Sequence, residues 1–168
     1  MRVAASVQVA APIERVWEIV SDPSRALSFM SGVTRWEVEG DELSGLGARY
    51  RVLFRVGAAE IGGLVELVEW DPPCELAWTS VLGVDQRGRW RLRQDARGRT
   101  RVEMRLAYGV AGAGLSGAIA ERVAAPILRG HLRRTLQQLK RLAEHEQLRR
   151  RAAERRATRG AEPSRGIG

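Results

Sequence analysis

The sequence predicts an α+β fold in which a curved antiparallel sheet of about seven strands wraps around one long C-terminal helix, with two short helices after the first strand. Three observations lead to this prediction. The chain opens with one strand-like and two helix-like segments, continues as strand-like runs as far as Tyr108, and finishes with a long amphipathic stretch. Its length of 168 residues suits a single domain.

The opening segments follow three local signals. Apolar residues occupy every second position from Val3 to Val9, which is typical of a strand with one buried face. Pro12 then stands where a first helical residue tolerates its missing N–H, and apolar residues follow at helical spacing as far as Val20. Ser21-Asp22-Pro23 supplies a cap and a proline for a second short helix that ends near Met30.

The middle of the chain alternates between apolar and charged residues. The even positions from Tyr50 to Val56 are apolar and arginines stand between them, every odd position from Arg87 to Arg93 is arginine, and the same phase recurs from Thr100 to Tyr108. Short turn sequences rich in Gly, Pro and Asp separate the runs, which implies antiparallel pairing of successive strands. We therefore expect a sheet with one apolar face and one arginine-rich face exposed to water.

The last helix is expected to cover the apolar face. It should run from about Leu115 to about Arg150, with a bend or restart near Pro126 and Gly130, because an internal proline removes a backbone donor. Its apolar stripe consists of Leu115, Ile119, Val123, Ile127, Leu128, Leu132, Leu136, Leu139 and Leu142.

This order of elements resembles the START-like superfamily, also called SRPBCC, and within it the polyketide cyclase/dehydrase-type and coenzyme Q-binding-type families. The resemblance covers roughly residues 2 to 145. It rests on Ala11–Trp17, Asp22-Pro23, Gly45–Tyr50, Val68–Pro73 followed by Leu76, and Leu136–Leu142. It implies a helix-grip fold. Its motifs fix turns and helix starts, so they indicate neither a particular ligand nor a reaction.

Charge divides the chain into two parts. Residues 1 to 128 contain 16 arginines and 16 acidic residues, so the net charge of +8 comes from the C-terminal end. We predict a START-like domain over 1–148 and a basic, disordered tail over 149–168, which lacks an apolar face. Because Lys140 is the only lysine, a coding bias toward arginine explains the arginine content better than phosphate recognition does. We therefore expect no specific nucleic-acid partner, and at most a weak contact between the tail and anionic surfaces.

The cysteine count and the hydropathy pattern bear on location. Cys74 is the only cysteine, which excludes an internal disulfide, and we expect it to be a small strand residue. Polar residues interrupt the N-terminal segment before it reaches signal-peptide length, and no segment has the ~20 apolar residues that a transmembrane helix needs. A cytoplasmic location is the expectation.

A glycine-rich turn precedes the last helix. Gly112, Gly114 and Gly117 have the spacing of a dinucleotide-binding fingerprint, but that motif needs a second parallel strand after the helix, and none follows here. We therefore expect no cofactor. These glycines form either a plain connector or, as in START-like proteins, a gate at the mouth of a cavity.

The inventory of reactive residues argues against metal and nucleophile chemistry. His131 and His145 are the only histidines, and 14 residues along one helix place them about 21 Å apart, too far to share a metal ion. Ser116 has no implied histidine partner. His131 is most simply a helix-face residue satisfied by water or backbone.

The aromatic residues suggest a ligand cavity. Five tryptophans outnumber the two phenylalanines and two tyrosines, and most of these aromatics fall on expected inner faces, where they could form either plain core or a cavity wall. The predicted lining is Met30, Trp36, Tyr50, Val52, Phe54, Trp78, Trp90, Leu92, Met104, Tyr108, Ile119, Val123 and Ile127.

Three functions are compatible with these features. The first is binding of a hydrophobic small molecule, such as a lipid, isoprenoid, polyketide or aromatic metabolite. The second is a polyketide cyclase, aromatase or dehydratase, whose acid or base would be Tyr50, Tyr108 or His131, with Gln94 as a polar positioner; none of them matches a catalytic motif. The third is an interaction module that uses the basic tail.

Overall fold

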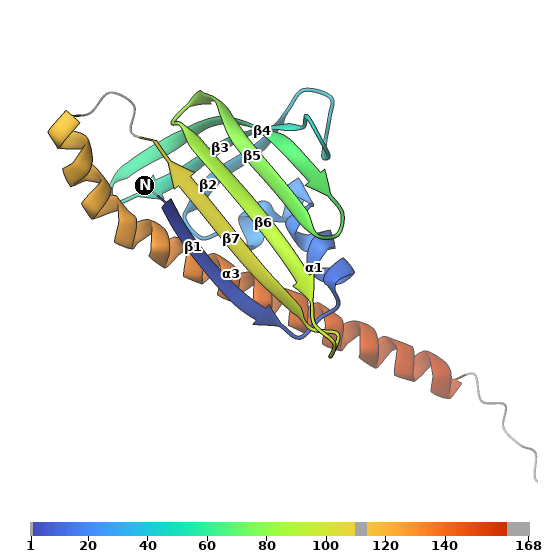
Figure 1. Cartoon of the computed structure of the whole chain (residues 1–168). Helices are drawn as coiled ribbons and strands as arrows, with labels where there is room; N and C mark the ends of the chain where they lie inside the picture. Colours follow the sequence, from blue (N-terminus) through green and yellow to red (C-terminus); the bar gives the residue numbers. More distant parts are fainter. Residues whose placement is uncertain (1, 110–113, 161–168) are drawn as a thin grey trace, which may run out of the picture.

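A computed structural model describes residues 2–109 and 114–160, without the side chains of 56, 114–124 and 160. Seven strands form one antiparallel sheet in the order β1-β7-β6-β5-β4-β3-β2, and α3 lies along its inner face (Figure 1). The predicted α+β helix-grip architecture is confirmed. The elements are β1 (Arg2–Val9), α1 (Ile13–Val20), η1 (Pro23–Arg25), α2 (Ala26–Phe29), β2 (Val33–Glu39), β3 (Arg49–Val56), β4 (Ala59–Asp71), β5 (Glu75–Gly83), β6 (Gln86–Gln94), β7 (Thr100–Tyr108) and α3 (Gly114–Gly160).

The N-terminal signals act close to the predicted positions. Pro12 is the N-cap of α1, so the helix begins one residue later than predicted, at Ile13, and its apolar face is buried. Asp22 caps the next segment by accepting a hydrogen bond from the Ser24 backbone N–H at 2.9 Å. That segment is a 3₁₀ turn followed by the single-turn helix α2, and it seats Phe29 in the core.

The two faces of the sheet differ as the alternation predicts. Inner-face residues such as Trp90, Val102 and Met104 are buried, whereas arginines stand on the outer face. Those arginines pair with acids across strands. Arg91 donates to Glu75 at 2.8 Å, and this hydrogen bond lowers the pKa of the Glu75 carboxyl.

Strand irregularities curl the sheet toward α3. The pairing register shifts once between β2 and β3, at Val33/Arg35, and twice between β4 and β5. Such bulges increase local twist. At Gly63 the strands approach so closely that a Cβ atom would lie 1.9 Å from the Leu82 carbonyl oxygen, so only glycine fits there.

Cys74 is not a strand residue, contrary to the prediction. It lies exposed in the turn between β4 and β5, where its backbone N–H donates to the Asp71 carbonyl at 2.7 Å. The two prolines before it have no N–H to donate to a ladder, so the turn extends to Cys74.

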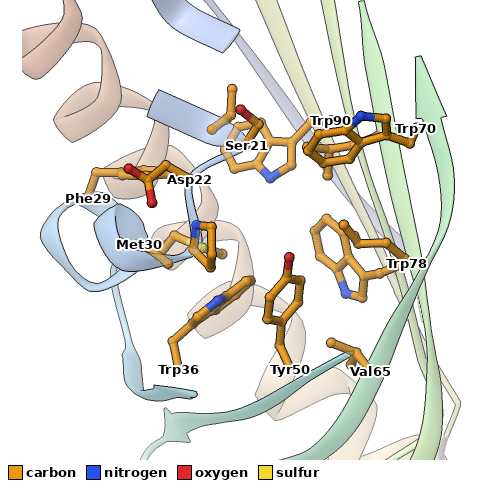
Figure 2. Close-up of a pocket in the computed structure, with 15 residues that line it drawn as sticks. Ser21, Asp22, Phe29, Met30, Trp36, Tyr50, Val65, Trp70, Trp78 and Trp90 are labelled. Atoms are coloured by element: carbon orange, nitrogen blue, oxygen red, sulfur yellow. The ribbon is translucent and has the colours of Figure 1, made fainter. Parts of the chain in front are cut away.

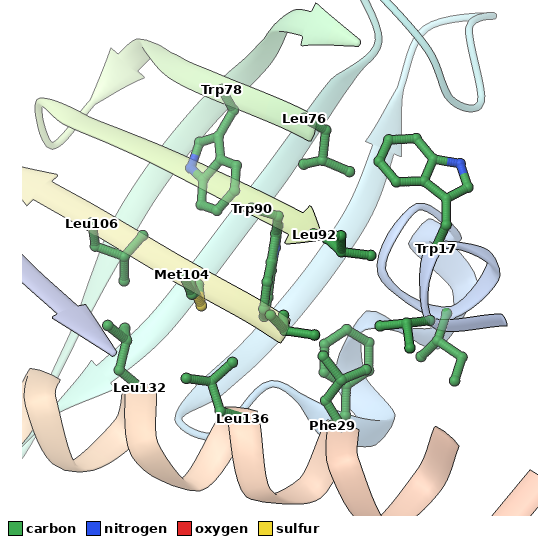
Figure 3. Close-up of a cluster of buried hydrophobic side chains, with 14 of the residues drawn as sticks. Trp17, Phe29, Leu76, Trp78, Trp90, Leu92, Met104, Leu106, Leu132 and Leu136 are labelled. Atoms are coloured by element: carbon green, nitrogen blue, oxygen red, sulfur yellow. The ribbon is translucent and has the colours of Figure 1, made fainter. Parts of the chain in front are cut away.

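Helix α3 closes the core. Figure 3 shows Leu132 and Leu136 directed at Met104 and Trp90 of the sheet, and Leu139 is fully buried. The helix also contacts β1, β3, β7, α1 and α2.

The end of α3 differs from the prediction. The helix reaches Gly160, beyond the expected end near Arg150. It also continues through the exposed Pro126 as one helix, so of the two alternatives predicted there, a bend or a restart, the restart does not occur. Residues 151–159 are all exposed and extend past the sheet (Figure 1). Arginine, alanine and glutamate have high helix propensity, which accounts for a helix without a packing partner. The division into a domain over 1–148 and a tail over 149–168 stays a prediction.

Candidate ligand cavity

The described residues enclose two neighbouring spaces between the sheet and the helices. The first, here the tryptophan cavity, is bordered by Trp36, Trp70, Trp78 and Trp90 together with Tyr50 and residues of α2 (Figure 2). The second, here the helix cavity, is bordered by Leu128, His131, Leu132 and Thr135 of α3 and by inner-face residues of β3, β6 and β7.

Both cavities are small in this structure. Measured as the space available to the centre of a water molecule, the tryptophan cavity has about 20 Å³ and the helix cavity about 50 Å³. A single water needs roughly 10–15 Å³ by this measure. Each cavity thus has room for no more than a few water molecules, and a larger molecule would have to displace side chains.

Three side chains separate the two cavities. Met30, Trp36 and Trp78 border both spaces. Met30 follows α2 and is half-buried, and methionine changes rotamer easily because it is unbranched. Trp36 stacks at a tilt on Tyr50, with 5.4 Å between the ring centroids. Met30 lies outside the sheet, so a change of its rotamer would alter the space beside both cavities and leave the strands in place.

The two tyrosines are not bases at neutral pH. Burial raises the pKa of Tyr50 to about 12, and its hydroxyl donates to the Leu43 carbonyl oxygen at 3.0 Å. Burial also raises the pKa of Tyr108, which borders the helix cavity. Both phenols therefore stay protonated at neutral pH, in the form that donates a hydrogen bond.

His131 belongs to a polar cluster at the helix cavity. Its Nδ1 atom lies 3.1 Å from Ser31 Oγ, and the Ser31 backbone N–H donates to Thr135 Oγ1 at 2.9 Å. Burial and the nearby Arg134 charge lower the pKa of His131, while a hydrogen bond with the Arg55 backbone opposes this shift. His131 is thus tied to the segment after α2, which the helix-face interpretation did not anticipate.

Gly32 allows this approach. It has a φ of +85°, and a Cβ atom there would lie 2.5 Å from His131 Nδ1. Glycine alone tolerates both the backbone angle and the contact.

Two buried donors near the cavities lack partners. Within the part of the chain that the structure describes, neither Trp36 Nε1 nor Gln86 Nε2 has a hydrogen-bond partner. Sequence reasoning missed Gln86, Ser31 and Thr135. Gln86 could have been found, since it occupies the buried phase of the strand that carries Trp90.

The predicted lining residues are distributed unevenly. Leu92 is buried in the core away from both cavities, and Ile127 is half-buried and borders neither. The side chains of Ile119 and Val123 and the whole of Gly112 lie outside the described residues, and Gly114 and Gly117 form the first turn of α3. Those that border a cavity are Met30, Trp36, Tyr50, Val52, Phe54, Trp78, Trp90, Met104 and Tyr108.

Gln94 takes no part in either cavity. It is exposed at the end of β6, and its Oε1 accepts a hydrogen bond from the Ile13 backbone N–H at 3.4 Å. Its position next to the start of α1 gives it a structural contact in place of the expected positioning role.

Two features are absent from the described residues. Residues 2–109 and 114–160 contain no group of three or more His, Cys, Asp or Glu side chains placed to hold a metal ion. None of the helices in these ranges combines the length and apolar character needed to cross a bilayer.

Sequence comparison defines the class of protein. A family model described as "Polyketide cyclase / dehydrase and lipid transport" matches residues 1–144. The chain therefore belongs to this family, as the resemblance implied. No curated protein matches it.

Solved structures share the fold. The protein TTHA0849 from Thermus thermophilus is 22% identical with a TM-score of 0.73, covering 85% of this chain and 97% of that one. The Zhui aromatase/cyclase from Streptomyces sp. R1128 is 20% identical with a TM-score of 0.71, covering 86% and 93%. DR_A0006 from Deinococcus radiodurans is 21% identical with a TM-score of 0.64, covering 87% and 99%. These identities establish similarity of fold alone.

Proposed function

We propose that this protein binds a hydrophobic small molecule, such as a lipid, isoprenoid, polyketide or aromatic metabolite, in the interior between the sheet and α3. The proposal is supported chiefly by the position of Met30, Trp36 and Trp78. These large apolar side chains border internal space on two sides. Family membership agrees with this role, since the family is described by both cyclase activity and lipid transport.

The proposal predicts that binding requires movement of Met30. Met30→Trp fills the space between the cavities, so it should weaken binding of the uncharged fluorescent probe N-phenyl-1-naphthylamine by about tenfold or more. Met30→Ala joins the cavities and should bind the probe at least as tightly as the wild type.

A matched control lies three residues earlier, on α2. Leu27 is 54% exposed, so Leu27→Trp adds the same side chain outside the cavities and should leave probe affinity unchanged. Equal affinities for the Met30→Trp and Leu27→Trp proteins would place the probe elsewhere and contradict the proposal.

The contact between Ser31 and His131 favours an enzyme as the second candidate. A histidine with a lowered pKa is neutral at physiological pH and can accept a proton. Beside an apolar cavity it could remove a proton from carbon next to a carbonyl group, the step that begins an aldol-type cyclisation. The solved aromatase/cyclase of the same fold is consistent with such chemistry.

Deuterium exchange tests the second candidate directly. In D₂O, the base would take a proton from C2 of 1-tetralone, the enolate would recover a deuteron, and NMR would detect the loss of the C2 proton signal. Exchange faster than in buffer, abolished by His131→Gln and retained by His145→Gln, is the expected outcome. Exchange at the buffer rate would contradict the second candidate and leave the binding proposal intact.

A further inference from the structure

We propose that the bound molecule carries hydrogen-bond acceptor oxygens, such as a carbonyl group, which are recognised by the Gln86 side-chain amide and the Trp36 indole N–H. This inference rests on the proposed binding function and deepens it. It concerns the polar part of the ligand, whereas the cavity walls alone would accept any hydrocarbon.

Gln86 is a buried amide at the edge of the helix cavity. The side chain begins β6 opposite Tyr108, borders the helix cavity and is 4% exposed. Its backbone N–H is satisfied by Ser80 Oγ at 3.1 Å, so the residue is anchored by its main chain. The side-chain Nε2 has no partner within the described residues.

Trp36 supplies a second donor from a strand that is not adjacent to β6. It stands on β2, near one end of the sheet order, whereas β6 is adjacent to β7 near the other. Its indole nitrogen is buried and without a partner among the described residues. Figure 2 shows the Trp36 ring directed toward the space beside Met30 and Tyr50.

The two donors define the chemistry of a ligand. Buried N–H groups are nearly always paired in folded proteins, because an unpaired donor loses its hydrogen bonds to water without replacement. Each of these N–H groups lacks an acceptor among the described residues, and the two residues that carry them both border the helix cavity. A hydrophobic molecule with one or more acceptor oxygens would satisfy them, and a pure hydrocarbon would leave them unpaired. The site therefore discriminates by oxygen content.

Two probes of the same ring skeleton test this inference. 1-Tetralone carries a carbonyl oxygen that tetralin lacks, and isothermal titration calorimetry can measure both affinities. The wild type should bind 1-tetralone about tenfold more tightly than tetralin. Gln86→Leu or Trp36→Phe should reduce that preference, and the double variant should abolish it, while affinity for tetralin stays within about twofold.

Gln94→Leu is the matched control, since Gln94 lies on the same strand outside both cavities, and it should keep the preference. The unliganded Gln86→Leu protein should melt at the wild-type temperature or above it, because it loses an unpaired donor.

Three other results would each contradict part of this account. Equal wild-type affinity for the two probes, or a preference that survives the double variant, would overturn the inference while leaving the binding function in place. A marked fall in melting temperature for Gln86→Leu would show that the amide has a structural partner and would also overturn it. Failure of both probes to bind would contradict the proposed function itself, and the inference would fall with it.

Discussion

His131 shows how one residue joins three elements. It stands on α3, contacts the Ser31 hydroxyl after α2 and faces the Arg55 backbone of β3, with Gly32 making room for its ring. Because it is partly buried beside Arg134, the folded protein favours the neutral imidazole.

This environment predicts a pH-dependent stability. The pKa of folded His131 lies below its ordinary value, so the unfolded chain takes up a proton near pH ~6.5 while the folded chain does not. The stability that comes from this difference in pKa is fully present above about pH 6.5 and is lost as the pH falls through the pKa of folded His131. The free energy of unfolding, measured with urea at several pH values between 5 and 7, should therefore change less steeply with pH for His131→Gln than for the wild type. As a control, substitution of the exposed His145 by Gln should leave the pH dependence of the free energy of unfolding as in the wild type. The same pH dependence in His131→Gln as in the wild type would contradict the account.

Gly88 leaves room for the ring of Trp78, which borders both cavities. A Cβ atom there would lie 1.9 Å from Cζ2 of Trp78, its partner across the strands. Gly88→Ala should destabilise the protein by about 1–3 kcal/mol, as overpacking does. The cost should shrink in a Trp78→Phe background, because phenylalanine lacks the clashing ring atoms. Additive effects of the two substitutions in urea unfolding would show that the ring is not the cause.

At the scale of elements, α3 depends on packing in its middle and on propensity at its end. Leu128, Leu132, Leu136 and Leu139 are buried, whereas residues 151–159 have no packing partner among the described residues. Gly130 is a helical position where a Cβ atom would meet nothing closer than Arg134 Nη2 at 3.4 Å, the end of a flexible side chain.

Gly130→Ala should therefore stabilise the protein. Alanine is favoured over glycine inside a helix by about 1 kcal/mol, and the side chain fits here. The measurement is the urea midpoint at constant m-value. Gly32→Ala is the contrast, since its positive φ and the His131 contact should make the same substitution destabilising. A loss of stability in Gly130→Ala would show that the helix is tighter against its neighbours than these contacts indicate.

The elements were largely predictable because alternation and caps are local signals. Arginines at alternate positions indicated which face of β6 and β7 points to solvent, and Pro12 indicated where α1 begins. The site was less predictable because it depends on contacts between distant segments. Ser31 meets His131 across 100 residues, and the sequence holds no sign of that contact. The end of α3 was misjudged because an exposed helix carries no hydrophobic pattern.

On the scale of the whole molecule, the domain and the basic end of α3 carry different properties. The basic end of α3 is its part from residue 149 onward. Arg150 forms an exposed ion pair with Glu18 of α1 at 3.4 Å, and the structure gives no side-chain contact with the domain for the described residues after it. Exposed pairs contribute little to stability. The core, in contrast, lies under the sheet and is closed by the earlier part of α3.

A chain ending at Gln147, which lacks all six arginines of this end, should accordingly keep the fold and the cavity. Its melting temperature should stay within about 3 °C of the full chain, and its affinity for N-phenyl-1-naphthylamine should not change. Any binding of the full chain to anionic vesicles should weaken with salt and disappear in the shortened chain, because six arginines between 149 and 159 face only Glu154. Loss of folding in the shortened chain would show that the end packs against the domain.

The central claim is that a hydrophobic molecule binds between the sheet and α3, and the five tryptophan indole N–H signals in a ¹⁵N-correlated NMR spectrum test it most directly. Trp36 and Trp78 border both cavities, Trp70 and Trp90 border one, and Trp17 borders neither. Addition of 1-tetralone should shift the Trp36 and Trp78 signals most and the Trp17 signal least. Shifts confined to Trp17, or no indole shift at saturating probe, would contradict the claim.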